Sequence, residues 1–499
     1  MKPPAIYRTR ELRQIELDFA HLPLMERAGL AGAEIARQMI GDAGARVLVL
    51  AGPRNNGGDA FVVARWLREW FFDVTLAYRG DAAQLSTDAA AAYAAWIAAG
   101  GSAVGEIPPG WRGALIVDGL FGIGLARPLD GDYARWVEWA NAAGAPILAL
   151  DVPSGLDADT GRVAGPCIRA ARTASFIALK PGLVTADGPD HCGEVAVLDL
   201  GLDLGAQAGG GELVRWPDLA CSLPDVLSRR RRNVHKGSFG TLGIIGGSAG
   251  MVGAALLAGR AALFTGAGKT LVGLTAPEAP RVDPTAPELM LRTAAAVLDA
   301  PVDALVCGPG LGTGDTAREW VRRALAVRAP LLLDADALNV LAADPALVAL
   351  TRSRDHATLL SPHPGEAARL LGISGTAVQG DRLAAATTLA ATLNAAVALK
   401  GVGTVIAAPD GGWQINASGN AGLASGGTGD TLSGFVGALL AQGIAGVDAL
   451  RLAVCLHGAA ADALVAAGEG PLGLTAGELP AAARALLNAA AKTPRAGPV

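Results

Sequence analysis

The sequence has few cysteines and few lysines. Its five cysteines are odd in number, lie far apart and form no C-x-x-C pair, which argues against a disulfide framework and against a thiolate metal site. Only six of the 41 basic residues are lysines. We attribute the excess of arginine to coding bias, and the scarcity of lysine gives more weight to each lysine that falls inside a motif.

Long apolar runs and a strong net charge are also missing. No uninterrupted apolar run reaches the roughly 18 residues that a membrane span needs. The first residues, MKPPAIYRTR, contain no apolar h-region of a secretion signal. The formal net charge of -5 gives no electrostatic case for binding nucleic acid or an anionic membrane. We therefore expect a cytoplasmic protein with neither kind of partner.

The length of 499 residues exceeds what one ordinary hydrophobic core accommodates, so we expect two or three domains. In the first half, short apolar strands alternate with helix-length segments, which predicts βαβ units around a buried parallel sheet. Ligands of such sheets bind beyond the carboxyl ends of the strands. The predicted strands are Val47–Ala51, Val74–Tyr78, Leu115–Val117, Ile147–Leu150 and Ser175–Leu179, with helices at Ala60–Trp70 and Tyr133–Ala143.

The alternation stops between about Asp203 and Arg232, where a glycine-rich run precedes four arginines. This composition predicts a domain junction, so we expect domains at residues 1–205 and 233–499 with a linker at 206–232. The arginine run is most simply a solvated face of that linker. A second series of strands and helices begins at Thr241–Ile245 and ends in three long helices after Thr428.

Three familiar signatures are incomplete. Gly268-Lys269-Thr270 resembles the end of a P-loop, but position 263, where the motif requires its first glycine, is leucine. The loop at Gly122 starts like a dinucleotide fingerprint, but Arg127 occupies the third glycine position. The G-x-S-x-G match around Ser248 has no HGGG-type oxyanion segment. We therefore reject all three interpretations.

Three successive turns of the first half carry acids and glycines. They span residues 54–59, 118–128 and 151–157, each after a predicted strand. Glycines allow a close approach of the backbone to a ligand, and the oxygens of asparagine and aspartate suit a hard cation. Because the three turns share one edge of the sheet, we expect one pocket.

These turns resemble the N-terminal domain of NAD(P)H-hydrate epimerases, which read N-N-G-G-D, V-D-x-L-F-G-x-G and D-x-P-S-G. The resemblance implies a Rossmann-like three-layer domain that acts on hydrated NADH or NADPH, with potassium held by Asn56, Asp118 and Ser154. It implies dinucleotide contacts from Asn55, Asn56, Gly57, Gly58, Asp59, Gly122, Ile123, Gly124, Leu125, Ala126, Arg127, Pro128, Tyr133 and Asp151.

Inversion at the hydrated ring carbon needs groups that move protons. Asp151 is the candidate acid–base group, and Lys180 is its possible partner. The alternative for Lys180 is an exposed position at the end of a strand.

The second half carries a different set of motifs. They are H-K-G at 235–237, G-P-G-L-G at 308–312, D-A-D-A-L-N at 334–339, P-H-P-G-E at 362–366, K-G-V-G-T at 400–404 and G-G-T-G-D at 426–430. In the last of these, backbone N–H groups at a helix start form an anion hole for a phosphoryl group. The adjacent Asp430 can accept the proton of a substrate hydroxyl, although an N-cap aspartate would look the same.

This half resembles the ADP/ATP-dependent NAD(P)H-hydrate dehydratases, which have a ribokinase-like three-layer fold. The resemblance implies that the hydrate contacts Ala254, Gly312, His363 and Asp430, and that Mg²⁺ accompanies ADP or ATP. It implies that the nucleotide contacts Lys400, Gly401, Val402, Gly403, Thr404 and Gly429. In that mechanism Asp430 deprotonates the hydroxyl, the terminal phosphoryl group moves to it, and phosphate then leaves.

Two alternatives stay open. The second half could be a small-molecule kinase for a vitamin precursor or sugar, since the ribokinase-like fold hosts many substrates. The first half could be a non-catalytic binding module, although three acid-bearing turns argue against it. The preference for ADP or ATP, and for NADH hydrate or NADPH hydrate, is open. We expect a homo-oligomer.

Overall fold

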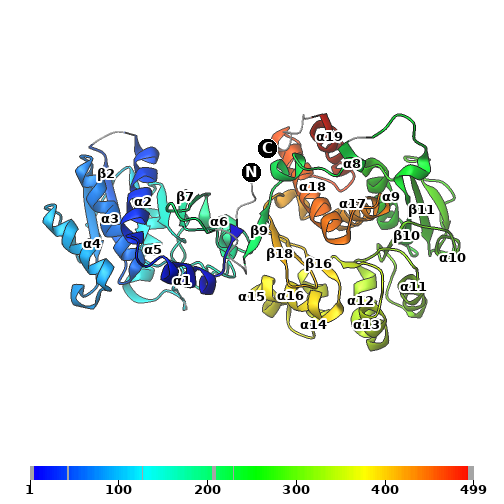
Figure 1. Cartoon of the computed structure of the whole chain (residues 1–499), viewed down its shortest axis with the longest axis horizontal. Coiled ribbons are helices and arrows are strands. Elements are labelled where there is room, and N and C mark those ends of the chain that lie inside the picture. The colour runs from blue at the N-terminus through cyan, green and yellow to red at the C-terminus, as the bar shows by residue number, and fades with distance from the viewer. Residues whose placement is uncertain (1–4, 42–43, 126, 205–209, 229, 493–499) are drawn as a thin grey trace. The chain divides into compact units, whose positions relative to one another are not determined.

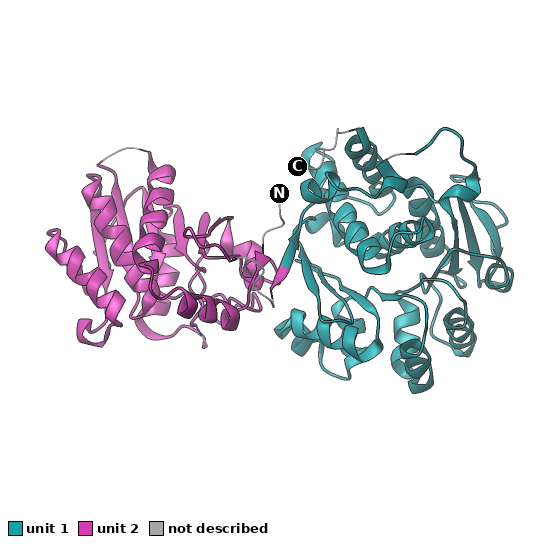
Figure 2. Ribbon diagram, in the orientation of Figure 1, with its two compact units in different colours: residues 1–3, 212–499 teal, residues 4–211 magenta. Residues whose placement is uncertain are grey.

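A computed structural model describes residues 5–41, 44–125, 127–204, 210–228 and 230–492. The chain divides into two compact units, residues 4–211 and residues 212–499 (Figure 2). Each is an α/β unit built around one predominantly parallel sheet (Figure 1). The predicted α/β fold class is thus confirmed.

The N-terminal unit has a seven-stranded sheet in the order β4-β3-β2-β5-β6-β7-β8, and all of its strand pairs are parallel. The strands are β2 (Arg46–Ala51), β3 (Asp73–Tyr78), β4 (Ala103–Val104), β5 (Leu115–Gly119), β6 (Ile147–Leu150), β7 (Arg172–Phe176) and β8 (Glu194–Leu198). The helices are α1 (Thr9–Asp18), α2 (Leu24–Ile40), α3 (Asn55–Glu69), α4 (Thr87–Ala98), α5 (Gly131–Ala142) and α6 (Gly188–Cys192).

Two local predictions in this unit are wrong. The segment 55–59 was predicted as a turn, but its asparagines and glycines are the first residues of α3, which begins directly after Arg54. The strand predicted at 175–179 ends at Phe176, where Ile177 turns to a φ of 68°. A β-branched residue in this left-handed region cannot continue a strand.

The chain first adds strands on one side of β2 and later adds strands on the other side of β2. From β2 it passes to β3 and β4, and from β5 it proceeds to β8 on the opposite side. Such a reversal opens a crevice between neighbouring strands at their carboxyl ends, which is where ligands of open α/β sheets bind. The crevice here lies between β2 and β5.

The C-terminal unit repeats this plan. Its sheet has the order β9-β18-β17-β16-β15-β14-β13-β10-β11-β12, and the reversal lies between β10 and β13. The pairs from β12 to β16 are parallel, whereas β16-β17 and β17-β18 are antiparallel. The strands are β9 (Gly211–Val214), β10 (Thr241–Gly246), β11 (Lys269–Leu274), β12 (Met290–Thr293), β13 (Ala304–Cys307), β14 (Leu331–Leu333), β15 (Thr358–Leu360), β16 (Ala396–Leu399), β17 (Val405–Ala407) and β18 (Trp413–Asn416).

The helices of this unit form two groups. The core group packs around α17, which lies between α9 and α18 (Figure 1). It consists of α9 (Val252–Thr265), α17 (Thr428–Ala441), α18 (Gly446–Ala466) and α19 (Leu479–Lys492). The other helices between β12 and β16 are α10 (Ala294–Leu298), α11 (Asp315–Leu325), α12 (Asp336–Ala343), α13 (Pro345–Arg352), α14 (Pro364–Leu371), α15 (Gly375–Gly380) and α16 (Arg382–Leu393).

Helix α17 is the centre of this core, and twelve of its fourteen residues are buried. A Cβ at Gly434 would lie 2.1 Å from the carbonyl oxygen of Ala258, so only glycine allows α9 to approach this closely. Helix α18 is long and apolar enough to cross a membrane by length and composition, but 72% of its apolar window is buried inside the unit. It is therefore the kind of helix expected in a soluble core.

The segment predicted as a linker, 206–232, has structure of its own. From Gly211 it contains β9, α7 (Trp216–Ala220) and α8 (Asp225–Ser228). Strand β9 pairs in parallel with β18, while α7 contacts α18 and α8 contacts α19. The prediction of a linker fails here because this segment completes the C-terminal sheet and core. Arg230, Arg231 and Arg232 are exposed, as predicted for the arginine run, while residues 205–209 and Arg229 lie outside the described residues.

Candidate functional sites

A cavity of about 1030 Å³ opens at the β2–β5 crevice of the N-terminal unit. Its walls include the loop after β2, the start of α3, the loops after β5 and β6, and parts of α1, α2 and α4. Of the predicted residues it is lined by Asn55, Asn56, Asp59, Gly122, Ile123, Gly124, Leu125, Asp151 and Lys180. The three motifs therefore share one pocket, as the sequence predicts.

Asp151 and Lys180 form a buried ion pair in this cavity. Lys180 Nζ lies 2.5 Å from Asp151 Oδ1, and it also donates to Ser175 Oγ at 3.0 Å and to the carbonyl oxygen of Phe176 at 2.7 Å. The Lys180 side chain is only 1% exposed, so the alternative of an exposed strand end is wrong. The second oxygen of Asp151 accepts from the backbone N–H of Ile123 at 3.2 Å.

Asp151 adopts a left-handed backbone conformation with a φ of 66°. A non-glycine residue in this region is strained, and such strain persists only where the surrounding contacts hold it. Here the contacts of its side chain with Lys180 and Ile123 supply that hold. The carboxylate is thereby fixed on the cavity wall.

Asp59 and Glu16 are among the further carboxyl groups that line the same cavity. Burial first, and then the charges of Asp151 and Glu16, raise the pKa of Asp59 well above its usual value. Burial, and then the charge of Asp151, raises the pKa of Glu16. Sequence reasoning missed Glu16, which α1 brings to the cavity from about 40 residues before the first motif, because no local pattern marks a helical glutamate as a site residue.

Of the residues predicted to hold a cation, Asn56 lines the cavity, and Asp118 and Ser154 are hydrogen-bonded to each other. Asp118 is fully buried and accepts from Ser154 Oγ at 2.6 Å and from the Ser154 backbone N–H at 2.8 Å. Burial raises the pKa of Asp118 to about 6, although these hydrogen bonds lower it. Asn56 is 7% exposed, and neither polar atom of its side chain has a hydrogen-bond partner.

Several predicted contacts do not reach the cavity wall: Gly57, Gly58, Arg127, Pro128 and Tyr133. Tyr133 packs edge-on against Phe121, with ring centroids 5.1 Å apart. A Cβ at Gly57 would lie 1.8 Å from the carbonyl oxygen of Gly52, and one at Gly58 would lie 2.5 Å from the side chain of Met25. Packing of α3 therefore already requires these two glycines. Ala126 lies outside the described residues.

In the C-terminal unit the G-G-T-G-D motif and Lys400 meet at the start of α17. Gly427, with a φ of 88°, precedes the helix, and Thr428, Gly429 and Asp430 form its first turn. The first N–H groups of a helix have no partner within it and attract anions. Burial first, and then the charge of Asp334, raises the pKa of Asp430 to about 6, while Lys400 acts in the opposite direction.

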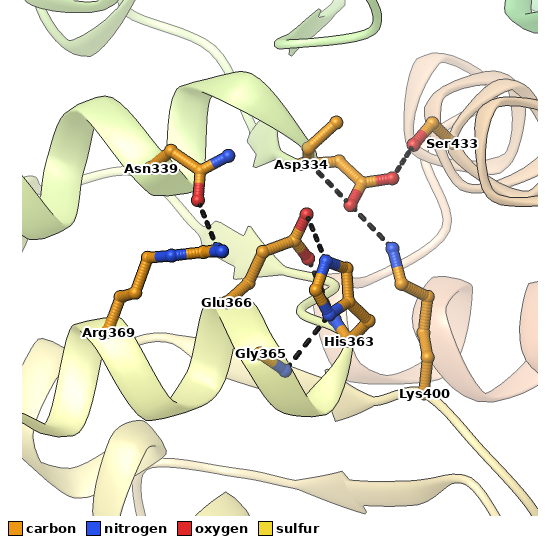
Figure 3. A network of polar contacts seen from close by, with 9 residues as sticks. Asp334, Asn339, His363, Gly365, Glu366, Arg369, Lys400 and Ser433 are labelled. Carbon is orange, nitrogen blue, oxygen red and sulfur yellow. Dashed lines mark hydrogen bonds and ion pairs between the residues drawn. The ribbon is translucent and has the colours of Figure 1, made fainter. Parts of the chain in front are cut away.

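Lys400 directly follows β16, and its side chain points toward Asp334 (Figure 3). Its Nζ lies 2.8 Å from Asp334 Oδ1, and it would lie 3.6 Å from a Cβ placed on Gly429. Burial alone would lower the pKa of Lys400, but the carboxylates of Asp334 and Glu366 outweigh this effect and raise it. The group is therefore a cation beside the predicted anion hole.

His363 is the N-cap of α14 and forms a capping box with Glu366. Its Nδ1 accepts from the backbone N–H of Gly365 at 3.0 Å, and its Nε2 lies 3.3 Å from Glu366 Oε1 (Figure 3). Burial and the nearby Lys400 lower the pKa of His363, so the ring is neutral at pH 7. Burial raises the pKa of Glu366 to about 7.

Loops from both sides of the β10–β13 crevice meet near the remaining predicted residues. A Cβ at Gly310 would lie 3.0 Å from the Cβ of Ala254, and the backbone N–H of Gly312 donates to Asp336 Oδ2 at 2.8 Å. Asn339, on the same helix as Asp336, accepts from Arg369 at 2.7 Å (Figure 3). The structure thus joins the G-P-G-L-G and D-A-D-A-L-N motifs at one edge.

Sequence reasoning missed two residues beneath the helix start. Ser433, on α17, donates to Asp334 Oδ2 at 2.5 Å. His457, on α18, is 8% exposed, and burial lowers its pKa to about 4. Both lie on helices whose sequences consist mostly of small and apolar residues, so only the packing of these helices connects them to the site.

The folds and the two sites define a two-domain α/β protein of the class that joins a Rossmann-like unit to a ribokinase-like unit. Two family models match it: the YjeF-related protein N-terminus over residues 21–182, and NAD(P)H-hydrate dehydratase over residues 242–479. The chain belongs to the family of bifunctional NAD(P)H-hydrate repair enzymes, as the relatives show.

Two of these relatives carry the name bifunctional NAD(P)H-hydrate repair enzyme Nnr. The one from Escherichia coli is 40% identical over 452 residues, which cover 89% of this chain and 85% of the relative. The one from Coxiella burnetii is 37% identical over 497 residues, which cover 97% and 99%. Among solved structures, the ADP/ATP-dependent NAD(P)H-hydrate dehydratase from Bacillus subtilis, co-crystallised with ATP and Mg²⁺, is 32% identical and has a TM-score of 0.50; the match covers 56% of this chain and 99% of the Bacillus chain.

Proposed function

We propose that this protein repairs hydrated nicotinamide nucleotides in two steps: it interconverts the R and S forms of NAD(P)H hydrate, and it dehydrates the S form to NAD(P)H with ADP or ATP. We assign epimerisation to the unit at residues 4–211 and dehydration to the unit at residues 212–499. The observation that carries this proposal is the presence of both Asp430 and the Lys400 ammonium group at the N-terminus of α17, next to the D-A-D-A-L-N and P-H-P-G-E segments.

For epimerisation, Asp151 is the proton-transfer group. Lys180 forms an ion pair with its carboxylate, and the hydrogen bond from the Ile123 N–H orients it. The hydrated ring carbon bears a hydroxyl and the ring nitrogen, so it inverts when the hydroxyl leaves and water returns on the other face. This exchange needs one group that donates a proton and one that accepts it. The carboxyl groups of Asp59 and Glu16 lie on the same cavity wall and complete the polar surface around the ring.

A potassium ion fits the cluster of Asn56, Asp118 and Ser154. Asn56 Oδ1 is a buried oxygen without a partner, and Asp118 is a buried carboxylate whose charge no described cation offsets. Among the described residues no group of three or more His, Cys, Asp or Glu side chains could hold a metal, so one carboxylate with neutral oxygens favours a monovalent ion. When bound, potassium would supply a fixed positive charge near the ligand.

For dehydration, Asp430 removes the proton of the substrate hydroxyl, and the hydroxyl oxygen attacks the terminal phosphorus of the nucleotide. The bond from this phosphorus to the bridging oxygen breaks, so AMP leaves from ADP, or ADP from ATP. The backbone N–H groups of the first turn of α17, together with Lys400, bind the oxygens of that phosphoryl group. Loss of phosphate from the ring, with loss of a proton from the neighbouring carbon, then restores the dihydropyridine. Mg²⁺ bound with the nucleotide offsets the phosphate charge.

The remaining predicted contacts belong to these two ligands. We assign Ala254, Gly312 and His363 to the hydrate, and the segment Lys400–Thr404 to the nucleotide. These assignments rest on the meeting of the loops at the β10–β13 crevice and on the position of Lys400 over Gly429. We do not favour a small-molecule kinase joined to a non-catalytic module, because relatives named as bifunctional repair enzymes match along nearly the whole chain.

The decisive experiment incubates the purified protein with a mixture of R and S hydrates, Mg²⁺ and either ADP or ATP. Complete recovery of reduced-nicotinamide absorbance is expected, because epimerisation supplies the S form continuously. Recovery that stops when the S form is consumed would contradict the epimerase assignment, and recovery without nucleotide would contradict the dehydratase mechanism.

Two further proposals concern the setting of the enzyme. We place it in the cytoplasm, where NADH and NADPH are used, and cell fractionation tests this location. We also propose a homo-oligomer, since closed symmetric assemblies are common among soluble enzymes. Light scattering after size exclusion measures the number of chains, and a monomeric mass would refute this proposal.

A further inference from the structure

Three side chains, those of Ser433, Asp334 and Lys400, are connected in series by hydrogen bonds (Figure 3). Ser433 Oγ donates to Asp334 Oδ2 at 2.5 Å, and Asp334 Oδ1 accepts from Lys400 Nζ at 2.8 Å. Lys400 then reaches the space above Gly429. Ser433 follows Asp430 by three residues, so the two side chains lie on neighbouring positions of one helix face.

The middle residue of this chain is held firmly. Asp334 is 1% exposed and Ser433 is fully buried. Asp334 Oδ1 also accepts from the backbone N–H of Ala335 at 2.8 Å, and Ala335 has a left-handed φ of 50°. A non-glycine residue in this conformation marks a strained turn that its surroundings maintain. Asp334 is thus a rigid anchor at the end of β14, with both carboxylate oxygens in use.

Lys400, by contrast, has a choice of partners. The carboxylates of Asp334, Glu366 and Asp430 all act on its ammonium group. A lysine has a flexible four-carbon stem and a compact charge, so without an anchor its ammonium would turn toward another carboxylate. An ion pair with Asp430 would occupy the group that must accept the substrate proton, and it would leave the space over Gly429 without its cation.

We propose that Asp334 and Ser433 are positioning residues, which hold the Lys400 ammonium over Gly429 for the terminal phosphoryl group of the nucleotide and keep it from pairing with Asp430. This inference rests on the proposed dehydratase function. It adds that the ammonium group of Lys400 is positioned by the carboxylate of Asp334 and the hydroxyl of Ser433. Neither residue needs to contact the hydrate or the nucleotide for its loss to slow the reaction.

The test compares the full-length Asp334→Asn and Ser433→Ala variants with the wild type, using S hydrate, Mg²⁺ and ADP or ATP. A displacement of about 1 Å at a reacting centre can cost about 100-fold in rate, so we expect kcat of Asp334→Asn to fall about 100-fold. Ser433→Ala removes only the outer hydrogen bond, so we expect a roughly 10-fold loss, in line with one bond to a charged group. If Asp334→Asn folds poorly because it alters a buried charge, Ser433→Ala still tests the proposal.

A pH profile separates positioning from simple structural support. The charged groups that act on Asp430 are Asp334, Lys400 and Asp336. In Asp334→Asn, one like charge is lost and the ammonium of Lys400 approaches, and both changes favour the ionised form of Asp430. The acid limb of kcat should therefore move to lower pH while its plateau falls. Because loss of the Asp334 charge moves the limb by itself, Ser433→Ala, which removes no charge, is the decisive variant. A limb at lower pH in this variant reports that Lys400 has moved toward Asp430, and an unmoved limb reports a purely structural role.

Asp283→Asn is the matched control, because Asp283 is a fully buried aspartate that pairs with Arg260 at 2.7 Å. We expect it to lower the melting temperature and leave the pH profile of the folded enzyme unchanged. An Asp334→Asn variant with wild-type kcat, or with a loss and a profile equal to those of Asp283→Asn, would overturn the proposal. A wild type that does not use nucleotide would instead refute the dehydratase function itself, and the proposal with it.

Discussion

Replacement of Asp430 by asparagine should abolish dehydration and at the same time stabilise the fold. As the general base, Asp430 must be ionised to act, and removal of such a group typically costs 100- to 10,000-fold. Because its pKa is about 6, the wild-type rate should fall as pH drops through 6, to about one tenth at pH 5. The variant should show neither the activity nor this limb.

The stability gain follows from the same pKa. An acid whose pKa rises on folding, here from 3.8 to about 6, destabilises the folded state once it ionises. The penalty is absent below the unfolded pKa, grows between 3.8 and about 6, and is complete above that range. Asparagine removes it, so the gain in unfolding free energy should be about 3 kcal/mol at pH 8 and about half of that at pH 5.

The assay combines calorimetry of the full chain at both pH values with separate measurements of the two activities. Asp355→Asn is the matched control, because it removes one negative charge at an exposed position. Epimerisation, followed by separation of the R and S forms, should proceed normally in Asp430→Asn. A variant that loses both activities, or one that is less stable than the wild type at pH 8, would refute the reasoning.

Three further predictions concern single positions. Lys180→Met should reduce epimerisation by at least about 100-fold and leave dehydration of pure S hydrate intact; equal loss of both would contradict separate sites. Asp118→Asn should remove the dependence of epimerisation on potassium, measured by replacing potassium with tetramethylammonium, and a dependence that persists in the variant would place the ion elsewhere. Gly429→Ala should fold normally, since its nearest new neighbour, Lys400 Nζ, lies 3.6 Å away, yet raise the KM for nucleotide; an unchanged KM would mean that phosphate does not bind at this helix start.

Much of the fold could be predicted because its signals are local. The alternation of apolar strands and helices predicted β2, β3, β5 and β6 to within two residues, and the turns after them predicted one shared pocket. The segment at 206–232 was mistaken for a linker because its glycine-rich start and arginine run obscure β9. A strand of four residues is stabilised mainly by its partner β18, which lies about 200 residues away along the chain.

The glycines at 57 and 58 show why the local interpretation of a motif can fail. In sequence they suggest a backbone that opens to a ligand, but in the structure they are required where α3 packs on Gly52 and Met25. Asp59, on the same helix, does line the cavity. The helix periodicity, which was not evident from a run of polar and small residues, decides which side chains of the motif face the ligand.

The sequence by itself determined the α/β class, the two sets of motifs and the chemistry that their side chains permit, because each of these depends on residues close together in the chain. Only the tertiary structure decided which groups act on one another. The burial of Lys180 against Asp151, the arrival of Glu16 from α1 and the anchoring of Lys400 by Asp334 and Ser433 all depend on contacts between distant segments. Burial removes water from these charges, so their partners are set by packing rather than by residue type.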